Sequence, residues 1–171
     1  MVKRLGGVLA LVLVVLLGCS LVKGSSRVAS AEQQRVIVDE FWSLFPGTVE
    51  ATGTDPAHFV YAGGAIYTAE RIAERGLDYR SCSNDVDGTS LYMLSALVRD
   101  TSQRNSKDEY QQKVQGMRDL WESQGYEVLS VGPVSAGAEI KFVTDAGTEV
   151  RYSAGEHAEI IQVQTACVLS K

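Results

Sequence analysis

Six residues near the middle of the chain have the types and spacing of a calcium-binding loop. The segment from Ser83 to Gly88 (SNDVDG) places oxygen-bearing side chains at alternate positions and ends on a glycine, as in the first half of a loop that wraps Ca²⁺. The complete pattern needs a bidentate glutamate at the twelfth position, which here is Leu94. An ordinary turn built from Asp and Gly is therefore the better interpretation, and we expect no metal site there.

The other residue types that carry chemistry are sparse. The two histidines, His58 and His157, lie about a hundred residues apart, and His157 with Glu159 offers at most two metal ligands, where zinc needs three or four. The chain has no Gly-x-Ser-x-Gly nucleophile motif, and Gly63-Gly64 is not followed by the lysine of a phosphate-binding loop. We therefore expect no catalytic residue, no metal ligands, no cofactor and no enzymatic activity.

Aromatic side chains are the remaining candidates for ligand contact. Trp42, Trp121 and seven tyrosines are able to line a binding cleft, since aromatic rings offer large rigid surfaces. At helical spacing, however, such residues more often belong to the hydrophobic core. The core interpretation is favoured, and the cleft stays open as an alternative.

The amino terminus has the pattern of a targeting segment. Lys3 and Arg4 are its only charges, and both precede an apolar run from Leu5 to Leu17. An ordinary secretory cut at Ala29-Ser30-Ala31 would lie far beyond that run. A retained membrane anchor from Leu5 to Val22 would have 18 residues, the lower limit for crossing a bilayer, and glycines dilute it.

A third interpretation rests on Leu16-Leu17-Gly18-Cys19, directly after the apolar run. This segment resembles the lipobox of bacterial lipoproteins, with Leu17 bulkier than is usual at its position. The resemblance implies that the sulfur of Cys19 takes a diacylglycerol and that the chain is cut just before Cys19. Two or three acyl chains anchor a protein stably to a membrane, where one chain binds only marginally. We favour this interpretation over the other two.

The lipobox resemblance also bears on the other two cysteines. The chain has three cysteines, and an exported protein with an odd number leaves one thiol over. If Cys19 is acylated, Cys82 and Cys167 remain in an oxidising compartment, where a disulfide between them can form and persist. The alternative is a pair of buried free thiols. A disulfide would require the strand after Cys82 to lie close to the last strand.

The net charge excludes one class of partner. Removal of residues 1 to 18 leaves 14 Lys and Arg against 21 Asp and Glu, a net charge near minus seven. Binding to phosphate backbones needs clustered basic residues. We therefore expect no nucleic acid partner.

Helical spacing marks three segments. Ser30 and Gln33 form a capping box ahead of a helix over residues 31–45, which Pro46-Gly47 should end. Asp55-Pro56 predicts a second helix that continues to Gly76. A second capping box, Ser106 with Glu109, begins a third helix, which Gly125 ends.

Strand patterns fill the carboxyl half of the chain. Residues 90–98 are apolar on both alternating faces, as in a strand inside a sheet, and a buried helix is the alternative. After Gly125 the period changes to two, with a hairpin turn at Asp145-Ala146-Gly147 and a last strand in which Ile161, Val163, Thr165 and Cys167 share one face. This order predicts a single α+β domain with helices packed on one face of an antiparallel β-meander. Cystatins and nuclear-transport factors share that outline, but none of their motifs is present.

These features predict residues 1–18 as a lipoprotein signal peptide, 19–29 as a flexible tether, and 30–171 as one globular domain. The layout resembles the small actinobacterial lipoproteins of the mycobacterial Lpp type, whose function is unknown. The resemblance implies a domain held on the extracytoplasmic face of the cell membrane by its acylated cysteine. We expect a binding or interaction module of the envelope, with an envelope protein or a small apolar ligand as partner. A hydrolase with an unrecognised site is the alternative.

Overall fold

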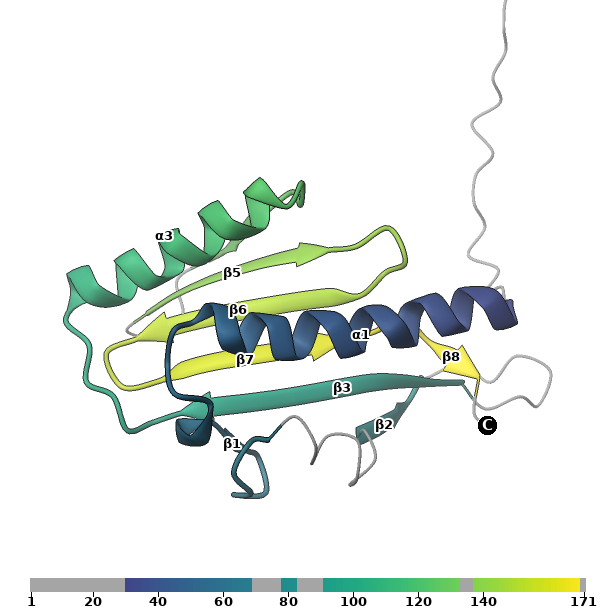
Figure 1. Ribbon diagram of the computed structural model, residues 1–171, viewed down its shortest axis with the longest axis horizontal. Coiled ribbons are helices and arrows are strands. Elements are labelled where there is room, and N and C mark those ends of the chain that lie inside the picture. Colours follow the sequence, from purple (N-terminus) through teal and green to yellow (C-terminus); the bar gives the residue numbers. More distant parts are fainter. Residues whose placement is uncertain (1–29, 69–77, 83–90, 133–136, 170–171) are drawn as a thin grey trace, which may run out of the picture.

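The computed structural model describes residues 30–68, 78–82, 91–132 and 137–169. Two long helices cover one face of a single antiparallel sheet, which is the α+β arrangement that the sequence predicts (Figure 1). Strands follow the order β1-β3-β7-β6-β5-β4, and β2 and β8 also pair with β3. Their bounds are Val60–Tyr61 (β1), Asp78–Ser81 (β2), Leu91–Asp100 (β3), Leu129–Val131 (β4), Gly137–Val143 (β5), Glu149–Gly155 (β6), Glu159–Gln164 (β7) and Val168–Leu169 (β8).

Helix α1 spans Ala31–Ala51 and begins at the predicted capping box of Ser30 and Gln33. The prediction that it ends at Pro46 is wrong, because the helix continues for another turn. Pro46 has no N–H to donate back along the helix. Thr48 and Val49 in the following turn are buried in the core, and this packing holds the chain in the helix despite the lost hydrogen bond.

Helix α3 spans Lys107–Ser123, and its capping box is formed as predicted. The Ser106 N–H donates to Glu109 Oε2 at 2.6 Å, and the Glu109 N–H donates to Ser106 Oγ at 3.3 Å. Its apolar stripe packs on β5 and β6, where the Trp121 ring meets Phe142 edge-on at 4.7 Å between centroids. Packing of this stripe fixes which face of α3 lies against the sheet.

The predicted helix from Asp55 to Gly76 is wrong over its described part. Only Pro56–His58 form a short 3₁₀ turn (η1), and the chain then enters β1. Gly64 adopts a φ of 78°, a backbone conformation that glycine takes without steric cost. The chain reverses there, and the Tyr67 N–H donates to the Phe59 carbonyl at 2.8 Å. Residues 69–76 of the predicted helix lie outside the described residues.

The predicted meander is confirmed in β4, β5, β6 and β7, which pair in sequence order. The turn between β5 and β6 closes at Gly147, which has a φ of 88°, with the Thr144 N–H donating to the Thr148 carbonyl at 2.9 Å. The predicted strand at residues 90–98 is confirmed as β3, which pairs with β7. The sequence patterns did not predict the short strands β2 and β8.

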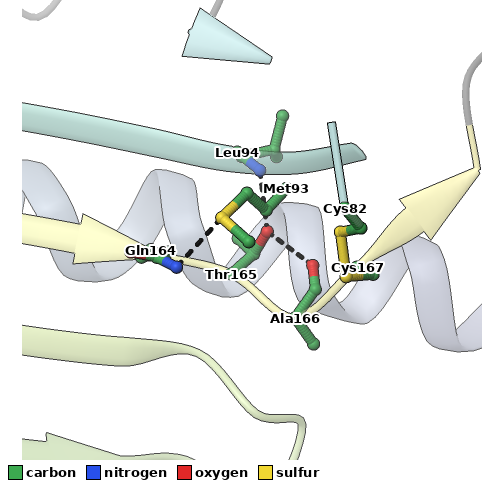
Figure 2. Close-up of a disulfide and its surroundings, with 7 residues drawn as sticks. All are labelled: Cys82, Met93, Leu94, Gln164, Thr165, Ala166 and Cys167. Atoms are coloured by element: carbon green, nitrogen blue, oxygen red, sulfur yellow. Dashed lines mark hydrogen bonds between the residues drawn. A yellow bond between two sulfur atoms is a disulfide. The ribbon is translucent and has the colours of Figure 1, made fainter. Parts of the chain in front are cut away.

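The predicted disulfide between Cys82 and Cys167 is confirmed. The two Cα atoms lie 6.2 Å apart across a sequence separation of 85 residues, within the reach of a disulfide. Tyr92 of β3 pairs with Ser81 of β2 on one side and with Val168 of β8 on the other. The bond therefore joins the two strands that flank β3 at its beginning, and Figure 2 shows it in front of the sheet with α1 behind.

A β-bulge precedes Cys167. Because of it, the prediction that Cys167 shares one face of the last strand with Ile161 and Val163 is wrong. Ser95 pairs with Gln164, whereas Tyr92 pairs with Val168, so the β7–β8 side holds one extra residue. Thr165 fills the gap: its N–H donates to the Leu94 carbonyl at 2.9 Å, and its Oγ1 accepts from the Leu94 N–H at 2.9 Å (Figure 2). The extra residue shifts the alternation, so Val168, not Cys167, follows Val163 on the helix-covered face.

Candidate functional site

An open groove of about 1080 Å³ lies between α3 and the strands β4 and β5. One wall is the first half of α3, and the other is the edge of the sheet. The lining residues are Asp108, Gln111, Gln112, Val114, Gln115, Arg118, Val128, Leu129, Ser130, Val131, Gly132, Gly137, Ala138, Glu139 and Ile140. We refer to this feature as the α3–β4 groove.

Helical spacing aims three polar side chains of α3 into the groove. Gln111, Gln115 and Arg118 recur at intervals of four and three residues, which places them on one face of a helix. The adjacent face carries buried Val114 and Met117 against the sheet. Core packing therefore fixes which side chains the groove receives.

Backbone geometry shapes the opposite wall where β5 begins. A side chain at Gly137 would place its Cβ 2.7 Å from the Ala154 carbonyl oxygen, closer than a Cβ atom approaches a carbonyl oxygen in proteins. The glycine thus allows β5 and β6 to pair at this point, and it leaves the wall of the groove without a side chain there.

Most charges in the groove are already paired. The Arg118 guanidinium donates to the Val128 carbonyl at 2.9 Å and to Ser130 Oγ at 2.8 Å, so it ties β4 to α3. Glu139 forms an ion pair with Arg151 at 3.3 Å. Asp108 is exposed at the mouth of the groove. The lining mixes polar and apolar side chains and carries little uncompensated charge apart from Asp108.

Aromatic residues do not line this groove. Trp121 is 3% exposed and packs on Phe142, and Trp42 lies half-buried against Phe41, with ring centroids 5.6 Å apart. These contacts confirm the core interpretation for both tryptophans.

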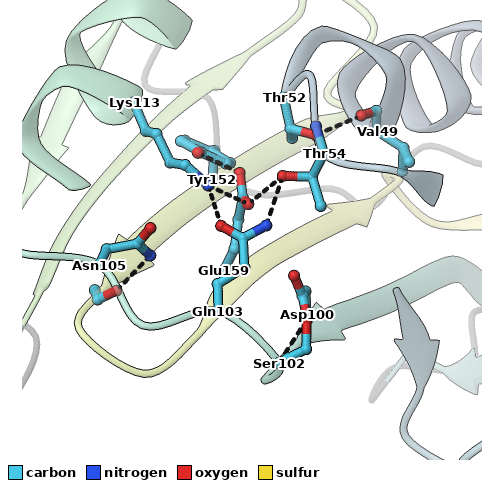
Figure 3. Close-up of polar contacts among 11 residues, drawn as sticks. Val49, Thr52, Thr54, Asp100, Ser102, Gln103, Asn105, Lys113, Tyr152 and Glu159 are labelled. Carbon is cyan, nitrogen blue, oxygen red and sulfur yellow. Dashed lines mark hydrogen bonds and ion pairs between the residues drawn. The ribbon is translucent and has the colours of Figure 1, made fainter. Parts of the chain in front are cut away.

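A second polar feature lies inside the domain, around Glu159 (Figure 3). Glu159 is fully buried on β7. Its Oε1 accepts from the Tyr152 hydroxyl at 2.5 Å, and its Oε2 accepts from the Thr54 hydroxyl at 2.8 Å and from Lys113 Nζ at 3.1 Å. Gln103 bridges Lys113 and Thr54. We call these five residues the Glu159 cluster.

The Glu159 cluster joins distant parts of the chain, and its hydrogen bonds run between its own members. Its members come from the segment after α1, the β3–α3 connection, α3, β6 and β7. Burial, followed by the charge and hydrogen bond of Glu159, raises the pKa of the Tyr152 hydroxyl far above its usual value, so Tyr152 stays a donor. Both oxygens of Glu159 accept hydrogen bonds, so the cluster joins these parts of the domain.

Asp100 lies beside this cluster as a second buried carboxylate. The register of β3 and β7 pairs Asp100 directly with Glu159, and both residues are 0% exposed. Asp100 Oδ1 accepts from the N–H and the hydroxyl of Ser102 at 2.7 and 2.6 Å. Its Oδ2 has no hydrogen-bond partner within the described part of the chain. Two carboxylates in direct opposition destabilise a sheet unless a cation compensates, and Lys113 is that cation.

His157 and Glu159, the two residues considered as metal ligands, do not come together. His157 is 70% exposed and lies 4.0 Å from Glu156, whereas Glu159 turns into the core. Across the described ranges, no group of three or more His, Cys, Asp or Glu side chains is placed to hold a metal ion. Cys19 and the segment from Ser83 to Gly88 lie outside the described residues, and none of the described helices is long and apolar enough to cross a membrane.

The outer face of the sheet, opposite the helices, carries a chain of ion pairs. Lys141 contacts Glu149 at 2.7 Å, and Arg151 contacts Glu149 at 2.6 Å and Glu139 at 3.3 Å. Burial raises the pKa of Glu149, but the hydrogen bonds and charges of Arg151 and Lys141 outweigh it, and the net result is a lowered pKa. This row is balanced in charge and offers no excess of either sign to a ligand.

In the Glu149→Gln variant, the free energy of unfolding should fall less steeply as the pH is lowered from 7 to 3. A carboxyl whose pKa is lower in the folded state stabilises the fold above its unfolded pKa, near 4.3, and loses that contribution as the pH falls through the folded pKa. Urea unfolding at pH 7 and pH 3 measures the difference, expected to stay below about 1 kcal/mol for a partly exposed pair. Glu50→Gln, at an exposed position of α1, is the control; an equal change in both variants contradicts the assignment.

No family model matches the chain, and no curated protein matches it. A solved structure of a DUF4853 family protein from Actinomyces odontolyticus is similar at 16% identity, over 85% of this chain and 71% of that one, with a TM-score of 0.46.

Proposed function

We propose that this protein is an exported lipoprotein, anchored through acylated Cys19 on the extracytoplasmic face of the cell membrane, and that its domain is a binding module of the envelope. The α3–β4 groove is the surface that contacts the partner. The observation that carries the binding role is this groove, which combines unpaired amide side chains with the free edge of a strand.

The disulfide supports the location. It closes a separation of 85 residues, and bonds of this kind persist in oxidising compartments outside the cytoplasm. It also uses two of the three cysteines in the sequence, which leaves Cys19 for acylation. The lipobox pattern and the disulfide are independent features that agree on export.

The site chemistry favours binding over hydrolysis. The groove lining contains no histidine and no cysteine, and Ser130 Oγ already accepts from Arg118. Hydrolysis by a nucleophile needs a base within hydrogen-bond reach. The buried carboxylate of Glu159 is saturated by donors and shielded from solvent. Neither feature offers a substrate an activated nucleophile.

Cys19→Ala should abolish incorporation of radiolabelled fatty acid and move the protein out of the membrane fraction, or leave uncut precursor. The reason is that lipidation and cleavage of this signal both require the cysteine sulfur. Labelling followed by immunoprecipitation measures the outcome, and Ser20→Ala is the matched control, expected to be labelled like the natural chain. Labelling that survives in the Cys19→Ala protein would remove the lipoprotein interpretation.

Binding at the groove is tested by placing a photocrosslinking amino acid at Gln111 in the full-length protein of intact cells. Gln111 is exposed and lines the groove, whereas Ser43 is exposed on α1 and serves as the control. We expect a discrete adduct from position 111 that is absent from position 43. The same adducts at both positions, or none at either, would contradict the groove as the binding surface.

A further inference from the structure

We propose that the occupant of the α3–β4 groove is an extended segment of a partner protein, which lies alongside β4 and alternates apolar with uncharged polar side chains. This inference rests on the proposed function and specifies its ligand class. It is carried by the strand edge, by the alternation of side chains along β4, and by the charges of the groove.

The edge of β4 supplies backbone hydrogen bonds. β4 pairs with β5 on one side, and no other described strand pairs with it. An unpaired strand edge presents N–H and C=O groups that an extended peptide can satisfy by joining the sheet. β4 has three residues, and Pro133 follows soon after it in the sequence. Main-chain pairing is therefore short, and the helix side of the groove must contribute.

The helix wall supplies that contribution through amides. Gln111 and Gln112 are exposed, line the groove, and make no hydrogen bond within the described ranges. A glutamine amide both donates and accepts, so it can pair with the polar groups of a peptide without a charge on either partner. On the α3 wall Asp108 is charged and Gln115 already donates to Asp119, so among the described residues these two amides are the uncharged groups left to pair with a ligand.

Alternation along β4 predicts the pattern of the bound segment. Ser130 pairs with buried Ile140, so it faces the helix side, whereas Leu129 and Val131 pair with Lys141 and Glu139 on the outer face. Leu129 is 46% exposed. An added strand would place alternate residues beside Leu129 and Val131, where apolar side chains fit, and the others beside Ser130 and the glutamines.

The charges and the side-chain types of the lining limit the class of ligand further. Arg118 and Glu139 are already paired, and the exposed carboxylate of Asp108 at the mouth repels acidic side chains. Sugar polymers are the other class of ligand rich in hydrogen-bonding groups. The absence of an aromatic side chain from the lining argues for a polypeptide, because no flat ring is available on which a sugar would stack.

The test uses an array of fluorescent nonapeptides and the full-length protein in detergent micelles. Three peptide classes are compared: alternating apolar and uncharged polar residues, the same with glutamate at the polar positions, and the same composition without alternation. We expect binding to be at least tenfold tighter for the first class. Methylation of alternate backbone nitrogens should weaken it at least tenfold, because it removes strand pairing.

Protein variants locate the contact. Gln111→Ala with Gln112→Ala should weaken binding of the first class at least tenfold, whereas Gln124→Ala, an exposed glutamine at the other end of α3, should leave it unchanged.

Equal binding of all three classes would overturn the proposal. If Gln111 crosslinks to a partner in cells and glycosidase digestion returns the adduct to the mass of the free protein, the peptide proposal fails while the binding module stands. If no crosslink forms either, both fail.

Discussion

Replacement of Cys82 and Cys167 by serine should lower the free energy of unfolding by about 4 kcal/mol. The disulfide closes a loop of 85 residues, and in the chain-entropy model such a loop restricts the unfolded state by roughly that amount. Domains of this size have about 5 to 15 kcal/mol of stability, so the bond accounts for a large share.

Urea unfolding of the oxidised natural protein and of the double variant measures this loss. The slope of the free energy against urea should rise in the variant, because its unfolded chain exposes more surface. Reduction of the natural protein should reproduce both changes and leave membrane attachment intact, since a thioether at Cys19 is not reducible. A loss under 1 kcal/mol, or two free thiols titrated in the oxidised protein, would contradict the structural role of the bond.

Strand geometry explains why a bond at this place matters. β2 and β8 each contribute few residues to the sheet and pair only with β3. Short strands gain little from pairing alone. The disulfide holds both of them at the beginning of β3, and without it these two strands should be the first to separate from the sheet. Hydrogen exchange at the Cys82 N–H, which donates to the Leu91 carbonyl, reports that opening.

Local signals were enough to predict the elements that carry the groove. The capping box of Ser106 and Glu109 and the stripe through Val114 and Trp121 lie within one helix, so α3 follows from neighbouring residues. The alternation after Gly125 predicted the meander in the same way. The groove itself was not predicted, because it depends on how α3 crosses β4 and β5, and that crossing depends on contacts distant in sequence.

Two errors show where tertiary context overrode the local pattern. Phe59 and Ile66 fit a helical stripe by spacing, yet Phe59 is buried and Ile66 is 50% exposed, because Gly64 turns the chain back between them. Pro46 was expected to end α1, but buried Val49 keeps the next turn helical. In each case packing against the sheet outweighed a preference that residues express by themselves.

The Glu159 cluster was missed for a related reason. Glu159 lies on the same alternating face as Ile161 and Val163, and this parity predicts a buried carboxylate. Besides Tyr152, its direct partners are Thr54 and Lys113, which lie 105 and 46 residues away in the sequence, and Gln103 bridges those two. A buried charge can be suspected from periodicity, but the groups that satisfy it follow only from the fold.

Lys113→Met should lower the free energy of unfolding by about 3 kcal/mol. Removing one partner of a buried ion pair leaves an uncompensated charge and costs roughly 3 to 5 kcal/mol. The lower end applies because the Lys113 side chain is 25% exposed, although that of Glu159 is 0% exposed. Asp100 in direct opposition to Glu159 adds repulsion that Lys113 no longer offsets.

Lys141→Met is a matched control for this loss. The Lys141 side chain is 26% exposed, nearly the same as that of Lys113, and it contacts Glu149 at 2.7 Å. Its carboxylate partner is 24% exposed and reaches water, so the loss should stay below about 1 kcal/mol. Similar losses in the two lysine variants would show that burial of the carboxylate does not set the size of the effect.

The relative stability losses of the Lys113 and Glu159 variants show whether Lys113 acts through its charge or through its packing. Glu159→Gln keeps one oxygen, which can accept from the Tyr152 hydroxyl, and places an amide NH2 that can donate to Thr54 Oγ1. It also frees a lysine that reaches water, so its cost should be about 1 to 2 kcal/mol, below that of Lys113→Met. The double variant should be more stable than the sum of the two losses by at least about 1 kcal/mol, because it leaves no buried charge at Glu159. Urea unfolding of the four proteins measures this coupling. Additive losses, or a Glu159→Gln protein less stable than Lys113→Met, would show that Lys113 supports α3 by packing and not by neutralising Glu159.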